Sequence, residues 1–193
     1  MNVLWLGLKT IEMENFMHLN GDAADFTEEK IAADSDLLRQ KEYLVSFGYR
    51  HILTADVLTQ FPRRAVNIHI SLLPWNRGAD PNFWSFLEDT PKGVSIHYLT
   101  DRLDAGDILC QQEIFFDSEA TLRSSYDILM DAAKKLFMRH WDDLKASRIK
   151  SRPQTGAGSF HQKKDMEPYR SLLHQGWDTP VKEFAGAWNP KKV

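Results

Sequence analysis

The chain has 193 residues, a formal net charge of −3 and 42% hydrophobic residues. This length supports one domain with its own core, and the near-neutral charge excludes a basic nucleic-acid binder or an acidic disordered chain. No apolar run approaches the length of a membrane span, and a single cysteine, Cys110, excludes an internal disulfide and a multi-cysteine zinc site. We therefore expect a cytoplasmic protein with no signal peptide, no membrane partner and no nucleic-acid partner.

Strands and helices are expected to alternate through the first sixty residues. Apolar runs predict buried strands at residues 2–7 and 44–47, and the loop GYRHIL (48–53) follows the second. Residues 28–42 predict a helix capped by a threonine, whereas residues 13–27 carry no clear pattern. No G-x-G-x-x-G motif follows the first strand, so a dinucleotide-binding site is disfavoured.

Further elements are predicted around the middle of the chain. Thr54 as a cap and Pro62 as a stop predict a short helix between them. Alternation of polar and apolar residues predicts strands at 65–70 and 94–99, and a more continuously apolar strand is expected at 107–116. These strands belong to an α/β fold with a mostly parallel sheet and flanking helices.

The clearest helix of the sequence covers residues 119–146, where apolar residues recur at spacings of three and four. The basic stretch 146–165 contains proline and glycines and predicts a loop, and the tail after it predicts a short helix with several aromatic residues. We therefore divide the chain into a main domain, 1–147, and a short C-terminal extension, 148–193, that packs on it.

Polar residues with catalytic potential gather in and after the strand at 65–70. Asn67 and His69 are two residues apart, so a strand places both side chains on one face, and ligands collect at the carboxyl end of such strands. His97 lies on the next predicted strand, where a structural contact to the Asp104 loop and a direct role are equally good readings. Asp104 taken alone would be a turn former, since Asp and Gly favour turns.

These residues carry a resemblance to a known family. The pattern N-x-H-x-S-L-L-P, followed by Arg-Gly, G-x-S-x-H and D-x-G-D, resembles the folate-dependent formyltransferases, which include the glycinamide-ribonucleotide, methionyl-tRNA and sugar N-formyltransferases. The matching positions are Asn67, His69, Ser71, Leu72, Leu73, Pro74, Arg77, Gly78, Gly93, His97, Asp104, Gly106 and Asp107. The resemblance implies a Rossmann-like formyltransferase fold for the main domain.

The resemblance also implies the reaction: transfer of a formyl group from 10-formyltetrahydrofolate to a primary amine, with no metal. It implies that Asn67, His69 and Asp104 form the catalytic set. A donor must stabilise the oxyanion of the tetrahedral intermediate, for which the Asn67 amide and a protonated His69 are suited, and a base must take the amine proton. The sequence leaves open whether His69 or Asp104 takes that proton.

Two loops are expected to bind the folate, and a third segment the second substrate. Flat heterocycles need apolar walls with a few polar groups. The residues expected to bind folate are Tyr49, Arg50, His51, Ile52, Leu53, His97, Leu103 and Asp107. Those expected to bind the second substrate are Trp75, Arg77 and Gly78.

Among acceptors we favour a nucleotide-linked amino sugar, which would place the protein in lipopolysaccharide or O-antigen biosynthesis. The sequence shows neither the phosphate loop of glycinamide-ribonucleotide enzymes nor the large C-terminal domain of tRNA enzymes. Two alternatives stay open: a formyltetrahydrofolate hydrolase, and a non-catalytic protein that binds folate or nucleotides. The second is suggested by an N-terminal half that is expected to lack one strand–helix unit of the family. A homodimer is possible.

Overall fold

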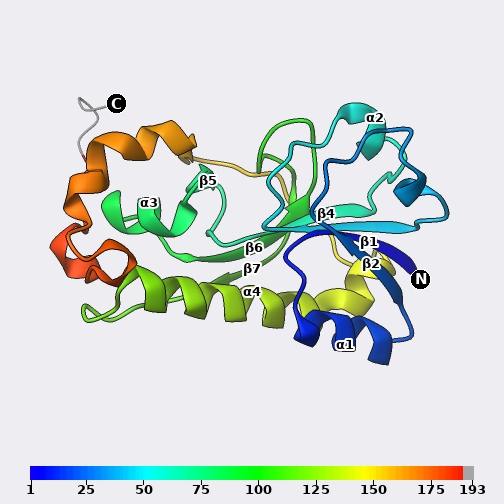
Figure 1. The fold of residues 1–193 in the computed structure, drawn as a ribbon, viewed down its shortest axis with the longest axis horizontal. Coiled ribbons are helices and arrows are strands. Elements are labelled where there is room, and N and C mark those ends of the chain that lie inside the picture. The colour runs from blue at the N-terminus through cyan, green and yellow to red at the C-terminus, as the bar shows by residue number, and fades with distance from the viewer. Residues whose placement is uncertain (189–193) are drawn as a thin grey trace.

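The computed structural model describes residues 1–188 of the chain. A six-stranded sheet lies at its centre (Figure 1). Its strand order is β2-β1-β3-β4-β6-β7. The strands are β1 (Asn2–Gly7), β2 (Ala23–Thr27), β3 (Tyr43–Phe47), β4 (Ala65–His69), β6 (Gly93–Tyr98) and β7 (Ile108–Glu113). The first four strands in this order are mutually parallel, and β6 is antiparallel to both of its neighbours. The predicted α/β fold with a mostly parallel sheet is confirmed.

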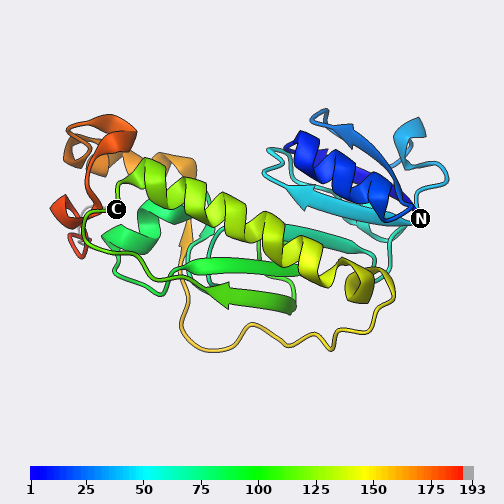
Figure 2. The same cartoon turned by 90° about the horizontal axis from the view of Figure 1, so that it is seen from below.

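Helices cover the sheet unequally. The long helix α4 (Leu122–Lys145) and α1 (Ile11–Leu19) lie on one face, as Figure 2 shows, while the short α2 (Ala55–Leu58) lies on the other. The helix α3 (Pro81–Leu87) lies beyond the end of the sheet with the C-terminal tail. The tail forms the 3₁₀ segments η2 (Lys163–Leu172), η3 (Gly176–Asp178) and η4 (Val181–Glu183). None of the helices within residues 1–188 is long and apolar enough to cross a membrane.

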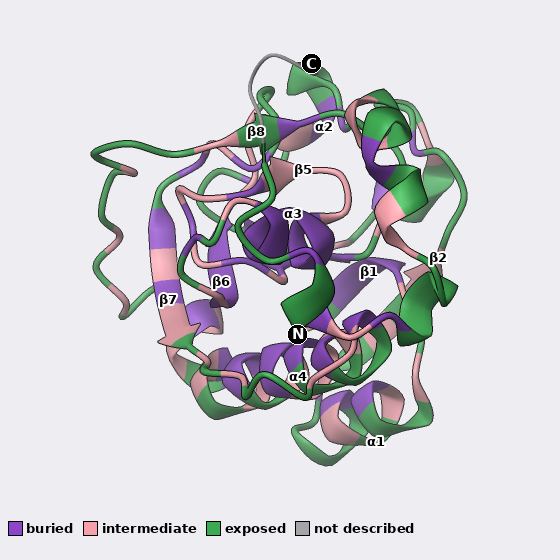
Figure 3. Ribbon diagram, turned by 90° about the vertical axis from the view of Figure 1, so that its left-hand side faces the viewer, coloured by how far each residue is buried: buried purple, intermediate pink, exposed green. Residues whose placement is uncertain are grey.

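Three apolar clusters hold these layers together. The largest joins α1 and α4 to the sheet through side chains such as Trp5, Phe137 and Trp141, and it includes Cys110, which packs in β7 as expected. A second cluster covers the opposite face beneath α2. The third packs α3 against the tail; all seven α3 residues are buried, and the helix is enclosed in the centre of Figure 3.

Five strands of the sheet and the long helix lie within a few residues of their predicted positions. The expected strand at 65–70 is β4, that at 94–99 is β6, and the helix expected at 119–146 is α4. Thr121 caps α4: its Oγ1 accepts a hydrogen bond from the Ser124 amide (3.1 Å), and the Ser124 hydroxyl accepts one from the Thr121 amide (2.9 Å). Thr54 precedes α2, but its side chain makes no capping hydrogen bond.

The predicted helix at 28–42 is wrong. The structure has only a 3₁₀ turn there, η1 (Asp36–Leu38), and its cap Ser35 accepts a hydrogen bond from the Leu37 amide (3.3 Å). Such side-chain to backbone bonds compete with helix formation. Two apolar side chains of the segment, Ile31 and Leu38, are buried in the second cluster in spite of the missing helix.

Three elements appear where no assignment was made from the sequence. Residues 13–27 contain most of α1 and all of β2; α1 buries only Met13 and Met17, and β2 is a half-exposed edge strand, so neither shows a strong period. In this chain the place of a helix between β2 and β3 is taken by the η1 segment. The helix α3 is buried all round, so it carries no polar face for periodicity to reveal.

The C-terminal extension contacts the main domain at several points. Its β8 (Phe160–His161) pairs in parallel with β5 (Arg77–Gly78), within the stretch 146–165 that was expected to be a loop. Arg152 forms an isolated bridge with Ile108, and the Val181 amide donates to the Ala120 carbonyl (2.8 Å). The division at residue 147 stays a prediction, and the last five residues of the extension lie outside the described part.

Candidate active site

Strand pairing brings three polar side chains to one place. Asn67 and His69 project from the same face of β4, and the antiparallel register of β4 and β6 places His97 directly opposite Asn67. His69 and His97 are buried, and Asn67 is half-buried. The Asn67 Nδ2 atom lies 3.2 Å from His97 Nε2. The two strands alone therefore fix an amide and two imidazoles side by side.

A tight loop delivers Asp104 to the same place. Asp104 adopts a left-handed backbone conformation (φ +50°), which Asp tolerates better than most residues. Position 106 in the same loop requires a glycine, because a Cβ there would collide with the Tyr98 carbonyl. From the C-terminal extension, Gln154 Nε2 donates to the Asp104 carbonyl (2.7 Å) and to the Gly106 carbonyl (2.8 Å). The turn that Asp104 forms is therefore the same turn that brings its carboxylate into the site.

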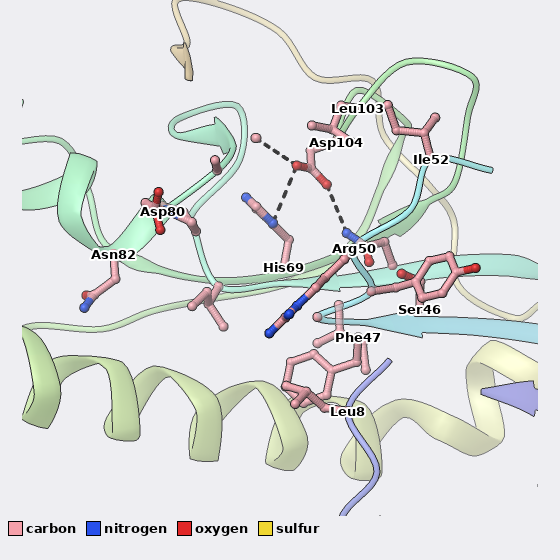
Figure 4. A pocket seen from close by; sticks show the side chains of 18 of the residues that line it. Leu8, Ser46, Phe47, Arg50, Ile52, His69, Asp80, Asn82, Leu103 and Asp104 are labelled. Atoms are coloured by element: carbon pink, nitrogen blue, oxygen red, sulfur yellow. Dashed lines mark hydrogen bonds and ion pairs between the residues drawn. The ribbon is translucent and has the colours of Figure 1, made fainter. Parts of the chain in front are cut away.

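Four polar groups surround the Asp104 carboxylate, and Figure 4 shows it beside His69. Its Oδ1 accepts a hydrogen bond from Asn67 Nδ2 (3.0 Å) and its Oδ2 accepts one from the Gly78 amide (2.9 Å). His69 Nδ1 lies 3.7 Å from Oδ2, and His97 Nε2 lies 3.4 Å from Oδ1. Burial alone would raise the pKa of Asp104, but the positive charges that His69 and His97 carry when protonated, together with the Gly78 N–H, hold that pKa well below its usual range. The group is a carboxylate at any physiological pH.

The neighbours of the two imidazoles fix where their protons lie. A carbonyl oxygen only accepts, so His69 Nε2, 3.0 Å from the Asn76 carbonyl, carries a proton. His97 Nδ1, 2.8 Å from the Tyr98 carbonyl, carries one for the same reason. Neutral His69 therefore presents an unprotonated Nδ1 beside Asp104. Neutral His97 presents an Nε2 lone pair to the Asn67 amide.

Asn76 and its partners hold the Nε2 side of the His69 ring, and none of them was predicted from the sequence. Asn76 is fully buried, in a left-handed conformation, and both ends of its side chain are bonded: Nδ2 donates to Glu88 Oε2 (3.1 Å) and Oδ1 accepts from Thr90 Oγ1 (2.9 Å). Its amide donates to Ser159 Oγ (3.0 Å). These bonds aim the Asn76 carbonyl at His69. The pattern W-N-R-G carried no signal for this, because the partners are far apart in sequence.

Glu88 also faces a buried histidine from the extension. His161 Nε2 lies 3.0 Å from Glu88 Oε1, and the ring of His161 stacks on Trp84 at 3.7 Å between centroids. Both side chains are about nine-tenths buried. Pairing of β8 with β5 places His161 beside Gly78, whose amide holds Asp104. The extension thus helps to position the site without lining it at this point.

A cleft of about 830 Å³ opens at these residues. Ile52 (65% exposed) and Leu103 (44% exposed) extend from two different loops at its edge, and Figure 4 shows them near each other. Exposed apolar side chains in this arrangement suit a flat heterocycle such as a pterin. The expected site residues that line the cleft are Tyr49, Arg50, His51, Ile52, Leu53, Asn67, His69, Gly78, His97, Leu103 and Asp104.

Three expected binding residues lie outside the cleft. Asp107 lines a separate, smaller hollow, and its Oδ2 accepts from the Ser151 hydroxyl (3.4 Å). Arg77 Nε donates to the Ser159 carbonyl (3.4 Å). Trp75 is half-buried, and its carbonyl accepts from the Ser71 hydroxyl (2.8 Å). None of the three lines the cleft, so their expected contacts with ligands stay predictions.

Tyr49 lines the cleft, but its hydroxyl is hydrogen-bonded to backbone groups of another segment. The Tyr49 hydroxyl donates to the Glu29 carbonyl (2.7 Å) and accepts from the Ile31 amide (3.1 Å). The tyrosine therefore ties the loop 48–53 to residues 29–31. Within residues 1–188, no three His, Cys, Asp or Glu side chains are grouped closely enough to hold a metal ion.

The lowered pKa of Asp104 predicts how stability depends on pH. Its charged form is favoured in the folded protein, so this contribution is complete above the unfolded-state pKa of about 3.9 and is lost as the pH falls through the lower folded-state pKa. We expect the difference in unfolding free energy between wild type and Asp104→Asn to shift in favour of the variant as the pH falls below about 4. Urea unfolding between pH 5 and pH 2 measures this, and a difference that stays constant over that range would contradict it.

Comparisons with known proteins point to one family. Residues 9–140 match the family model for the formyl transferase domain. The chain is 34% identical over 138 residues, 72% of its length, to a dTDP-4-amino-4,6-dideoxyglucose formyltransferase of Mycobacterium bovis. It is 35% identical over 128 residues, 66% of its length, to methionyl-tRNA formyltransferase of Listeria monocytogenes. The chain spans 58% of the length of the first of these relatives and 39% of the second.

A solved structure matches nearly the whole chain. The formyltransferase PseJ from Anoxybacillus kamchatkensis, in complex with UDP-4,6-dideoxy-4-formamido-L-AltNAc and tetrahydrofolate, has a TM-score of 0.94 and 42% sequence identity. The match covers 96% of this chain and 98% of PseJ. Methionyl-tRNA formyltransferase from Clostridium thermocellum shares the fold, with a TM-score of 0.69, 20% identity, and coverage of 92% of this chain and 78% of that one.

Proposed function

Because the chain belongs to the formyl transferase family, we propose that it moves the formyl group of 10-formyltetrahydrofolate to the primary amine of a nucleotide-linked amino sugar. One observation carries the proposal: Asn67, His69 and Asp104 line a single cleft, and the Asp104 carboxylate lies within hydrogen-bonding or ion-pairing distance of the other two. An amide donor, an imidazole and a carboxylate in contact are the groups that acyl transfer to an amine requires.

In this mechanism His69 takes the amine proton. The Asp104 pKa is lowered, so its carboxylate is a weak base, whereas neutral His69 offers a free Nδ1. The amine nitrogen attacks the formyl carbon, a C–N bond forms, and the amine proton passes to His69 Nδ1. The imidazolium is stabilised by the Asp104 carboxylate 3.7 Å away. It then donates the proton to the folate nitrogen as the bond from that nitrogen to the formyl carbon breaks.

Asn67 stabilises the oxyanion in the same mechanism. Its Nδ2 has two hydrogens, and both are directed at protein acceptors, Asp104 Oδ1 at 3.0 Å and His97 Nε2 at 3.2 Å. The bond to Asp104 fixes the amide plane. The longer bond to His97 is the one that the formyl oxygen shares or replaces. His97 therefore orients Asn67 before the substrate binds. Proton transfer by His69 and oxyanion stabilisation by Asn67 need no metal.

The acceptor class rests on the comparisons. The PseJ complex holds a UDP-linked formamido sugar, and the mycobacterial relative is named for a dTDP-linked amino sugar. These relatives support an amino sugar carried on a nucleoside diphosphate as the acceptor. We further propose that the protein acts in the cytoplasm, where folates and nucleotide sugars meet, in lipopolysaccharide or O-antigen biosynthesis.

An acceptor screen tests the proposed function. Purified protein is incubated with 10-formyltetrahydrofolate and with UDP- or dTDP-linked 4-amino-4,6-dideoxy sugars, and the products are identified by mass spectrometry. We expect one nucleotide sugar to gain a formyl group while tetrahydrofolate is released. Release of formate at the same rate without any amine would instead identify a hydrolase. Binding of folate with no turnover under any condition would identify a binding protein.

A further inference from the structure

Neutral His69 has one ring proton and two acceptors that compete for it. The Asn76 carbonyl lies 3.0 Å from Nε2, and the Asp104 carboxylate lies 3.7 Å from Nδ1. A proton on Nε2 leaves Nδ1 free to act as the base, whereas a proton on Nδ1 makes that nitrogen a donor to Asp104. Because the carboxylate carries a full charge, it would win this competition if the Asn76 carbonyl moved away. The reactivity of His69 therefore depends on what holds Asn76 in place.

The side chain of Asn76 is held by a carboxylate at the end of α3. Asn76 Nδ2 donates to Glu88 Oε2 at 3.1 Å, and the side chain of Glu88 is only 9% exposed. The Glu88 amide donates to the Trp84 carbonyl (2.9 Å), so Trp84 and Glu88 lie one helical turn apart on the same face. Taking a carboxylate out of water is unfavourable unless donors or a positive charge surround it. Glu88 therefore needs a second partner in addition to Asn76.

His161 supplies that partner from the C-terminal extension. Its Nε2 lies 3.0 Å from Glu88 Oε1, and its ring stacks on Trp84 with centroids 3.7 Å apart and planes at 7°. This nitrogen forms no well-aligned hydrogen bond within residues 1–188, so it interacts with Glu88 as an ion pair does, through charge. The Ala79 amide donates to the His161 carbonyl (2.9 Å) where β8 pairs with β5. Figure 3 shows β5 and β8 next to α3, so ring and backbone both hold His161 against Glu88.

We propose that Glu88 and His161 are positioning residues which, through Asn76, select the tautomer of His69 that has a free Nδ1. Neither side chain lines the cleft, so both act without touching a substrate. Without the pair, the Asn76 carbonyl would no longer be held at Nε2, and the ring proton would move to Nδ1 beside Asp104. This inference rests on the proposed function, which it deepens by giving the C-terminal extension a role in preparing the base.

Steady-state kinetics of single and double variants test the pair. Glu88→Ala removes the acceptor of Asn76 Nδ2, and kcat is expected to fall about 10²-fold, the loss that a displacement of about 1 Å can cause at an active site. His161→Phe keeps a ring on Trp84 but leaves the Glu88 carboxylate unpaired, so a loss of about ten-fold is expected. Glu88→Gln keeps an oxygen for Asn76 without a charge and should stay within a few-fold of wild type. Adding Glu88→Gln to His161→Phe should therefore raise kcat above that of His161→Phe alone. The KM values and the affinity for folinic acid should change little in all of them.

The tautomer of His69 can be measured independently of turnover. Long-range ¹H–¹⁵N correlation spectra at about pH 8.5, above the ordinary histidine pKa of about 6.5, show which ring nitrogen carries the proton. The signals of His69 are identified by their absence from the spectrum of His69→Gln. We expect the proton on Nε2 in wild type and in Glu88→Gln, and on Nδ1 in Glu88→Ala. Asp89→Asn and His174→Phe are matched controls that should behave as wild type in both measurements, since both residues are exposed and neither lines the cleft.

The outcomes separate this inference from the proposed function. Wild-type kcat in Glu88→Ala and His161→Phe, or a lower kcat with the His69 proton still on Nε2, would overturn the inference. If Glu88→Ala does not fold, His161→Phe and the double variant decide, because both keep a ring stacked on Trp84. If the proton moves in the variants while wild type formylates no amine, the tautomer selection is upheld and the proposed reaction fails. If wild type formylates an amine and no variant changes the tautomer, the reaction stands and the inference fails.

Discussion

Replacing Asp104 by Asn is expected to lower kcat by about 10³- to 10⁴-fold, the size of loss seen when a carboxylate that orients a catalytic histidine is neutralised in a serine protease. In the wild type this carboxylate accepts from Asn67 and from the Gly78 amide and stabilises the protonated form of His69. An asparagine keeps the shape but removes the charge, and its amino group must face one of those donors. Both the imidazolium and the oxyanion donor lose their support.

The measurement is steady-state turnover at saturating substrates, with folinic acid affinity as the test that the site has kept its form. Asp101→Asn is the matched control, because Asp101 lies in the same loop, is exposed and does not line the cleft. We expect that control to retain wild-type kcat and the Asp104 variant to bind folinic acid within a few-fold of wild type. Turnover by Asp104→Asn equal to that of the control would exclude the assigned role.

His69→Gln is expected to lower kcat by about 10²- to 10⁴-fold, the range for loss of a positioned general base. Glutamine retains an N–H for the Asn76 carbonyl, which His69 Nε2 serves at 3.0 Å, but it offers no basic nitrogen beside Asp104. Binding should survive, because the loops 48–53 and 99–104 that line the cleft do not depend on the imidazole.

Rapid-quench measurement of tetrahydrofolate formation in a single turnover isolates this step from product release. His18→Gln serves as the control, since His18 is exposed on α1, outside the cleft. An expected result is a slow chemical step in the His69 variant with unchanged affinities for folinic acid and UDP. A single-turnover rate of the variant equal to that of wild type would show that a group other than His69 is the base.

The sequence was sufficient for the parts of the molecule whose determinants are local. Period-two alternation located β4 and β6, and the three- and four-residue spacing located α4 almost to its ends. The N-x-H pair could be placed on one strand face because strand geometry fixes it. The family pattern then singled out Asp104, and the structure places its carboxylate against Asn67.

What the sequence could not supply depends on contacts between distant segments. The Asn76 carbonyl reaches His69 only because Glu88, Thr90 and Ser159 hold that residue, and the last of these is 83 positions away along the chain. The buried helix α3 has no polar face, so periodicity cannot reveal it, although Asp80-Pro81 is a usable start signal.

The wrong helix at 28–42 has a comparable cause. The segment contains good helix formers, yet Ser35 bonds to the backbone nearby, and the Tyr49 hydroxyl holds the Ile31 amide and the Glu29 carbonyl. Tyr49 lies eighteen residues after Ile31 and twenty after Glu29, so a local pattern does not reveal its bonds to them. Likewise, Asp107 and Arg77 match the family pattern but do not line the cleft, and their side chains bond to Ser151 and Ser159, which are far away in the sequence.

A crystal structure with folinic acid and a UDP-linked 4-amino sugar bound together tests the convergence of the three catalytic groups most directly. The expected result is a formyl oxygen within hydrogen-bonding distance of Asn67 Nδ2 and a sugar amine within hydrogen-bonding distance of His69 Nδ1, with Asp104 behind the imidazole. A ternary complex whose amine contacts Asp104 alone, or whose formyl group lies away from Asn67 and His69, would contradict the proposed mechanism.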